Sequence, residues 1–175
     1  MLLTNQQKFL LDAVKQLGCV REDQLVDLIR PVFCQKRPDI APALVHSAMS
    51  RLRHCNVDVR QEGDVFLYPG TELNPAFLEA VDVMLQLSHC TPMEYERGTA
   101  PVLLRFGVQS LDTFSAFLVA RGADRLPESV ISPVDRIILL FDGQSCPAAL
   151  PVSNKQFFAA RQGDGTHRFF APGGP

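Results

Sequence analysis

A short segment near residue 50 combines guanidinium, imidazole and hydroxyl side chains with no carboxylate. Residues 41–56 contain no Asp or Glu, and they include Arg51, Arg53 and His54. Arginine and histidine bind phosphate oxygens and base edges, and serine hydroxyls assist them. Arg60 follows on the next expected element. The sequence therefore predicts a local DNA-binding surface made of six residues: Ser47, Ser50, Arg51, Arg53, His54 and Arg60.

Residues that could carry out catalysis are few. No glycine-rich phosphate loop and no Gly-x-Ser-x-Gly turn occurs in the chain. Cys146 lies in a Ser-Cys-Pro-Ala-Ala segment, but no basic neighbour in the sequence would activate its thiol. Asp112, Asp135 and Asp142 lie at expected strand ends, where carboxylates either hold Mg²⁺ or, more commonly, face solvent. We therefore predict no catalytic residue, no metal site and no cofactor.

The charge distribution excludes a polybasic nucleic-acid binder. The 175 residues carry a net charge of −2. Residues 1–70 hold nine Lys and Arg against eight Asp and Glu, and residues 71–175 hold eight against eleven. Any binding to nucleic acid must therefore come from a local patch.

The cysteines and the N-terminal segment predict a cytoplasmic protein. The five cysteines are an odd number, widely spaced, and neither Cys-x-x-Cys nor a zinc-finger spacing occurs. The first residues show no basic start followed by a long apolar core. The longest stretch without a charged residue has twelve residues, 143–154, which is too short to span a membrane. We expect reduced thiols, a cytoplasmic location and no membrane association.

Three helices are expected to position the basic segment. Thr4 and Gln7 form a capping box that starts a helix ending at Gly18. A second helix spans about residues 21–30. Asp39 is expected to cap a third helix, which has Pro42 in its first turn and carries the basic side chains on its polar face.

A β-hairpin over residues 57–70, with its turn at 62–64, follows the third helix. Helix, helix, basic helix and hairpin is the order of a winged helix-turn-helix. In that fold the third helix enters the major groove and the hairpin flanks the DNA backbone. Small modules of this kind also make protein contacts, and three acidic residues of the hairpin would repel phosphate: Asp58, Glu62 and Asp64.

The second half of the chain changes to strand-length apolar runs. An apolar helix starting at Pro75 is either a connector or a dimerisation helix, and a loop is expected from its end to residue 100. Strands are expected at 101–108, 114–121 and 136–141, followed by a hairpin with arms at 155–161 and 167–172. The first of these arms is predicted as either a strand or a short helix. We expect an α+β fold in three parts: a winged helix-turn-helix over residues 1–72, a linker helix and loop over 73–97, and a small mixed-sheet α/β domain over 98–175.

This order of elements resembles the replication-relaxation family carried by plasmids and conjugative elements. The resemblance implies a restriction-endonuclease-like fold for the second half. An active enzyme of that fold needs a carboxylate and a Glu/Asp-x-Lys motif on the next strand to hold the metal and support the attacking water. The expected strand at 117–121 has no carboxylate, so the resemblance implies a degenerate module used for contact. Four aromatic residues belong either to such an interface or to the core: Phe157, Phe158, Phe169 and Phe170.

Two functions of different classes follow from these observations. The first is a non-enzymatic, DNA-binding accessory or regulatory protein of a mobile genetic element, with double-stranded DNA as its partner. The second is a protein-interaction adaptor whose winged helix binds a protein partner instead of DNA. Either protein could form a homodimer through the apolar helix and bind a further protein through its C-terminal half. A metal-dependent hydrolase is a third interpretation.

Overall fold

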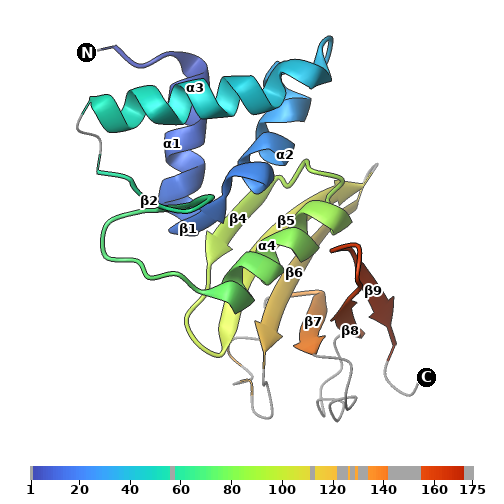
Figure 1. Cartoon of the computed structure of the whole chain (residues 1–175). Coiled ribbons are helices and arrows are strands. Elements are labelled where there is room, and N and C mark those ends of the chain that lie inside the picture. Colours follow the sequence, from blue (N-terminus) through green and yellow to red (C-terminus); the bar gives the residue numbers. More distant parts are fainter. Residues whose placement is uncertain are drawn as a thin grey trace. The chain divides into compact units, whose positions relative to one another are not determined.

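The structure is a computed structural model that describes residues 2–55, 58–110, 113–121, 126, 129, 134–141 and 155–171. These residues form an α+β protein with four α-helices and a mixed sheet of six strands (Figure 1). The predicted α+β class is thereby confirmed. The chain divides into two compact units, here called unit 1 (Met1–Val81) and unit 2 (Asp82–Pro175), and the boundary falls inside the fourth helix.

Helix α1 (Asn5–Leu17) begins and ends where the sequence predicts. The Thr4 hydroxyl accepts a hydrogen bond from the Gln7 N–H at 3.2 Å, and the Gln7 side-chain oxygen accepts one from the Thr4 N–H at 2.9 Å. Gly18 follows with a φ of 73°, which glycine adopts without a steric penalty. Its N–H donates to the Val14 carbonyl at 2.8 Å, so local rules set both ends of this helix.

Helix α2 (Glu22–Phe33) extends beyond the predicted end at residue 30. Pro31 lies inside it, where the missing N–H removes one hydrogen bond of the helix. The Phe33 ring packs edge-on against Phe9 of α1, with the ring centroids 5.6 Å apart. This tertiary contact stabilises a last turn that the sequence pattern alone does not predict.

Helix α3 (Ala41–His54) follows a short 3-10 turn, η1 (Pro38–Ile40). The predicted cap at Asp39 is wrong, because the N-cap residue is Ile40 and it makes no side-chain hydrogen bond. Pro38 has a φ suited to a helix and stands at the start of η1, so the chain is already turning at Asp39. Pro42 lies in the first turn of α3, as predicted.

Three short strands form an antiparallel sheet in unit 1: β1 (Cys19–Arg21), β2 (Arg60–Glu62) and β3 (Val65–Leu67), in the order β1-β3-β2. The predicted hairpin is confirmed as β2 and β3, whereas Val57 lies outside the described residues. The sequence does not predict β1, because a strand of three residues is too short to show an alternating pattern. It forms by pairing with the buried strand β3.

Helix α4 (Pro75–Leu87) begins at the predicted proline, and the Asn74 side-chain oxygen accepts the Phe77 N–H at 3.1 Å. The loop predicted after it is wrong in one place, because strand β4 (Glu94–Arg97) forms there. Its sequence, Glu-Tyr-Glu-Arg, is too polar for a buried strand. It suits the edge of a sheet, where charged side chains discourage pairing with another chain.

The six-stranded sheet of unit 2 has the order β4-β5-β6-β7-β8-β9 (Figure 1). Residues 155–161 form a strand, which decides between the strand and the helix that the sequence left open. The β6-β7 and β7-β8 pairs are parallel, and the other pairs are antiparallel. The five strands after β4 are β5 (Val102–Ser110), β6 (Thr113–Arg121), β7 (Arg136–Phe141), β8 (Lys155–Arg161) and β9 (His167–Phe170).

One face of this sheet carries a cluster of buried apolar side chains, among them Leu118, Ile137 and Phe158. Phe158 is 1% exposed and therefore belongs to the core. Phe170 packs partly buried against the same cluster, while Phe157 and Phe169 are half-buried.

Within the described part of the chain, no helix is both long enough and apolar enough to cross a membrane. The predictions that concern Asp112, Asp142 and Cys146 fall on residues outside this part.

Candidate nucleic-acid interface

The exposed face of α3 carries five of the six residues predicted to bind DNA. Its apolar face is buried in unit 1 through Val45, Met49 and Leu52. On the other side Ser47, Arg51, Arg53 and His54 are exposed, and Ser50 is half-buried. The amphipathic spacing of α3 thus fixes which side chains face solvent.

Helix geometry divides this exposed face into a centre and two borders. At about 100° per residue, Arg51 and Arg53 diverge by about 160° around the helix axis. They border the face on opposite sides, and the smaller Ser50 and His54 side chains lie between them. The smaller side chains at the centre allow a partner to approach the helix closely. The arginines at the two borders are placed to contact two negatively charged surfaces, one on each side.

Arg51 and Arg53 form no ion pair with any residue in the described part of the chain. Other arginines of unit 1 do form such pairs: Arg21 lies 2.9 Å from Asp23, Arg30 lies 2.7 Å from Asp27, and Arg60 lies 3.1 Å from Glu62. The two guanidinium groups on α3 therefore remain available for an external acceptor. An external acceptor can bind them without first breaking an ion pair within the protein.

His54 is oriented by its own helix. Its Nδ1 lies 2.7 Å from the Ser50 carbonyl oxygen. A carbonyl only accepts, so Nδ1 must carry the proton of this hydrogen bond. The other ring nitrogen, Nε2, then accepts a hydrogen bond when the ring is neutral and donates one when the ring is charged.

Arg60, the sixth predicted residue, lies near Arg53 although the two come from different elements. Both line a hollow of about 460 Å³ together with Asp58, Tyr68 and the turn at residues 69–71. The C-terminal end of α3 and the first strand of the hairpin thus present two arginines to one concave surface. Asp58, which also lines this surface, lowers its affinity for anions.

The hairpin is more acidic than α3. Residues 58–64 carry Asp58, Glu62 and Asp64 against the single basic residue Arg60, which is itself paired with Glu62. Its electrostatic contribution therefore opposes a polyanion, whereas that of α3 favours one.

His46 is an additional residue of this face that the sequence reasoning missed. Its Nδ1 lies 3.3 Å from a carboxylate oxygen of Glu22, and the imidazole is 76% exposed. It precedes Ser50 by four residues and Arg53 by seven, the spacing of one helix face. That spacing was a signal that could have identified it.

No metal site is evident in the residues that the structure describes, since no group of three His, Cys, Asp or Glu is close enough to hold an ion. Asp135 instead serves the sheet. Its carboxylate accepts the Ala116 N–H at 2.9 Å, and its own N–H donates to the Ala116 carbonyl at 3.0 Å. This carboxylate supports the start of β7 beside β6.

Comparisons of the chain with protein-family models, with curated proteins and with solved structures found no match, so the assignment of a function rests on the chain's own residues.

Proposed function

We propose that unit 1 is a winged helix-turn-helix that binds double-stranded DNA, and that the protein is a non-enzymatic accessory or regulatory factor of a mobile genetic element. The observation that carries the proposal is the exposed face of α3. It holds two arginines without a carboxylate partner among the described residues, and α3 itself contains no acidic residue.

The order of elements supports the winged-helix assignment. Unit 1 follows the sequence α1, β1, α2, α3, β2, β3, and its sheet has the order β1-β3-β2. Helices α2 and α3 correspond to a helix-turn-helix, and β2 and β3 correspond to the wing. In this arrangement the face of α3 with Ser47, Ser50 and His54 meets the base edges.

The arginine positions support a specific docking geometry. Arg51 and Arg53 border the exposed face on opposite sides, so each would contact the phosphates of one wall of the major groove. Arg60 would extend the contact on the Arg53 side, because the two arginines line the same hollow.

Unit 2 is proposed to serve contact instead of catalysis. Strands β5 and β6 contain no Asp or Glu, so this pair lacks the carboxylates that a nuclease-like fold would need for its metal.

The link to a mobile element rests on the similarity in element order alone. The proposed cytoplasmic location rests on the odd number and wide spacing of the five cysteines.

The proposal is tested with the double variant Arg51→Ala, Arg53→Ala. Loss of two phosphate contacts should weaken binding to a mixed-sequence duplex at least about tenfold at 50 mM salt and reduce the slope of log K against log salt by about 2. The matched control is Arg37→Ala, Arg161→Ala, which removes the same charge from two exposed positions outside α3. Equal affinity of the α3 double variant and the control would refute the role of α3.

A protein-interaction adaptor is the second candidate, and the acidic hairpin favours it. Three carboxylates against one guanidinium between residues 58 and 64 would attract a basic protein surface more readily than DNA. If the full chain binds no duplex at low salt, this candidate replaces the first.

A further inference from the structure

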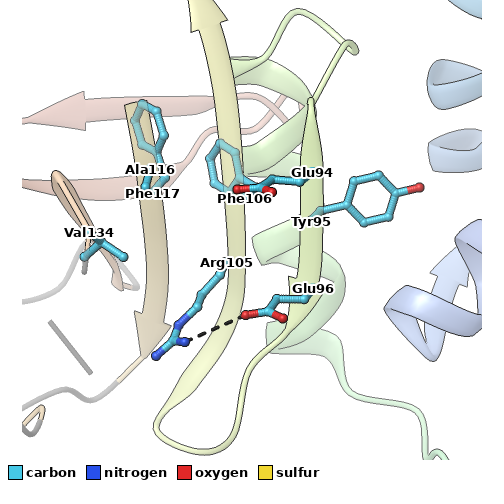
Figure 2. A pocket seen from close by; sticks show the side chains of 8 residues that line it. All are labelled: Glu94, Tyr95, Glu96, Arg105, Phe106, Ala116, Phe117 and Val134. Carbon is cyan, nitrogen blue, oxygen red and sulfur yellow. Dashed lines mark ion pairs between the residues drawn. The ribbon is translucent and has the colours of Figure 1, made fainter. Parts of the chain in front are cut away.

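A second hollow, of about 260 Å³, lies on the six-stranded sheet of unit 2 (Figure 2). The side chains that give it chemical character are Glu94 and Glu96 of β4, Arg105 of β5, and the small apolar residues Ala116 and Val134. Figure 2 shows the Glu96 and Arg105 side chains directed toward one another, while the Tyr95 ring points away from them. All residues that line this hollow belong to unit 2, whereas α3 belongs to unit 1.

The strand register determines which residues lie beside one another in this part of the sheet. Glu94 pairs with Gly107, and Gly107 pairs with Ala116, in one row across three strands. The Phe114 ring lies over Gly107, so the open space is beside this row and not above the glycine. A Cβ atom at Gly107 would come within 2.5 Å of the Phe114 ring, so this position cannot carry a side chain without a shift of that ring. Two rows further along, on the same face of the sheet, Glu96 pairs with Arg105.

Arg105 has more hydrogen-bond donors than acceptors around it. Its side chain is 34% exposed, and its Nε is buried without a hydrogen-bond partner. The nearest carboxylate oxygen, on Glu96, is 3.7 Å from Nη1, which is an ion-pair distance but too long for a hydrogen bond. The buried Nε lies out of reach of a ligand, but Glu96 leaves the exposed part of the guanidinium without a hydrogen bond, and a bound oxyanion would supply an acceptor there.

The two glutamates restrict which oxyanion fits. Glu94 and Glu96 are both exposed, and with Arg105 they give the hollow a net charge of −1. A phosphate dianion would be repelled by both carboxylates, whereas a carboxylate carries a single charge. An ammonium group on the same ligand would be attracted by the carboxylates that repel other anions.

We propose that this hollow binds a small zwitterion, a free α-amino acid, with its carboxylate on Arg105 and its ammonium group on Glu94 and Glu96. Drug-sized ligands occupy pockets of about 300–1,000 Å³, so a hollow of about 260 Å³ suits a ligand smaller than those, such as an amino acid. The small side chain of Ala116 and the apolar Val134 leave room for a short ligand side chain.

The test is isothermal titration calorimetry of the full chain with each of the twenty L-amino acids, and with propionate, propylamine and inorganic phosphate as single-group probes. At least one amino acid should bind with a Kd near or below about 1 mM, and about tenfold more tightly than propionate or propylamine. Absence of binding by all twenty at 10 mM, or equal binding of propionate alone, would overturn the proposal.

Three variants separate the roles of the charges. Arg105→Gln should weaken amino-acid binding at least about tenfold, and the exposed Arg161→Gln should leave it unchanged. The double variant Glu94→Gln, Glu96→Gln should weaken amino-acid binding and strengthen phosphate binding. Both glutamates are exposed, so this variant should fold even if Arg105→Gln does not. If the glutamate double variant kept the same ratio of amino-acid affinity to phosphate affinity, the assigned orientation of the ligand would be contradicted.

Discussion

Arginine is placed for two different partners in the two units. In unit 1, Arg51 and Arg53 stand exposed on a helix face that carries no acidic residue. In unit 2, Arg105 is two-thirds buried on a sheet and faces the carboxylate of Glu96. The first setting suits an extended polyanion, and the second suits a small ligand that brings both charges. Neighbouring carboxylates, rather than the arginine itself, decide which partner fits.

The comparison treats the two units as separate structures. The largest effect that tests this is expected from removing the buried side-chain amide of Gln24 in unit 1. Gln24 is 1% exposed, its side-chain oxygen accepts the Arg21 N–H at 3.0 Å, and its side-chain nitrogen donates to the Leu78 carbonyl at 2.8 Å. Gln24→Ala should lower the free energy of unfolding of unit 1 by about 2–3 kcal/mol, because a buried donor and acceptor lose their partner. Amide hydrogen exchange measures each unit separately.

The matched change in unit 2 is Gln86→Ala. The exposed Gln86 side chain donates to the His167 carbonyl and accepts the His167 N–H, both at 2.8 Å. Its loss should speed exchange in β9 and leave α1 and α2 unchanged, with a smaller cost of about 1 kcal/mol. Faster exchange in both units for either variant would show that they unfold together.

Neutralising a hairpin carboxylate sharpens the electrostatic side of the comparison. Glu62→Gln removes the carboxylate that lies 3.1 Å from Arg60, so it frees that arginine and reduces repulsion of phosphate. Duplex affinity should rise about threefold at 50 mM salt and less at 200 mM, because salt screens the effect. Glu96→Gln changes the same charge in unit 2 and is expected to leave duplex affinity unchanged. A gain of equal size in both variants would mean that only the net charge matters.

The smallest effect is expected at Asp164 in the turn between β8 and β9. Hydrogen bonds from the Thr166 hydroxyl and N–H lower the pKa of this exposed carboxyl below its ordinary value of 3.8. A carboxyl with a lowered pKa stabilises the fold above that ordinary value, and this contribution is lost as the pH falls through the lowered pKa. In Asp164→Asn the melting temperature of the protein should depend slightly less on pH below 3.8. An identical pH profile for both proteins would count against a contribution from this turn.

The sequence predicted elements that local rules determine. The Thr4 and Gln7 capping box, Gly18 and the long apolar strand β7 depend on residues close in the chain, and all three are confirmed. Strands β1 and β4 are short and depend on partners distant in sequence, so their own residues carry too little signal. The Asp39 cap failed because a neighbouring proline started the helical path earlier.

The candidate sites differ in the same way. The residues of α3 share one helix and have no acidic neighbour in sequence, so their face could be predicted from spacing. Their binding to DNA stays a prediction. The hollow beside Arg105 could not be predicted, because it depends on the β4-β5-β6 register that places Glu94, Gly107 and Ala116 in one row.

Fluorescence anisotropy of a labelled mixed-sequence duplex with the full chain, at 50 and 200 mM salt, tests the central claim most directly. With about three phosphate contacts, from Arg51, Arg53 and Arg60, affinity should fall about 40-fold between the two salt concentrations. Clear binding at 50 mM that declines in this way is the result that the account predicts. Absence of binding at 50 mM salt would contradict DNA binding by α3 and leave the adaptor function in its place.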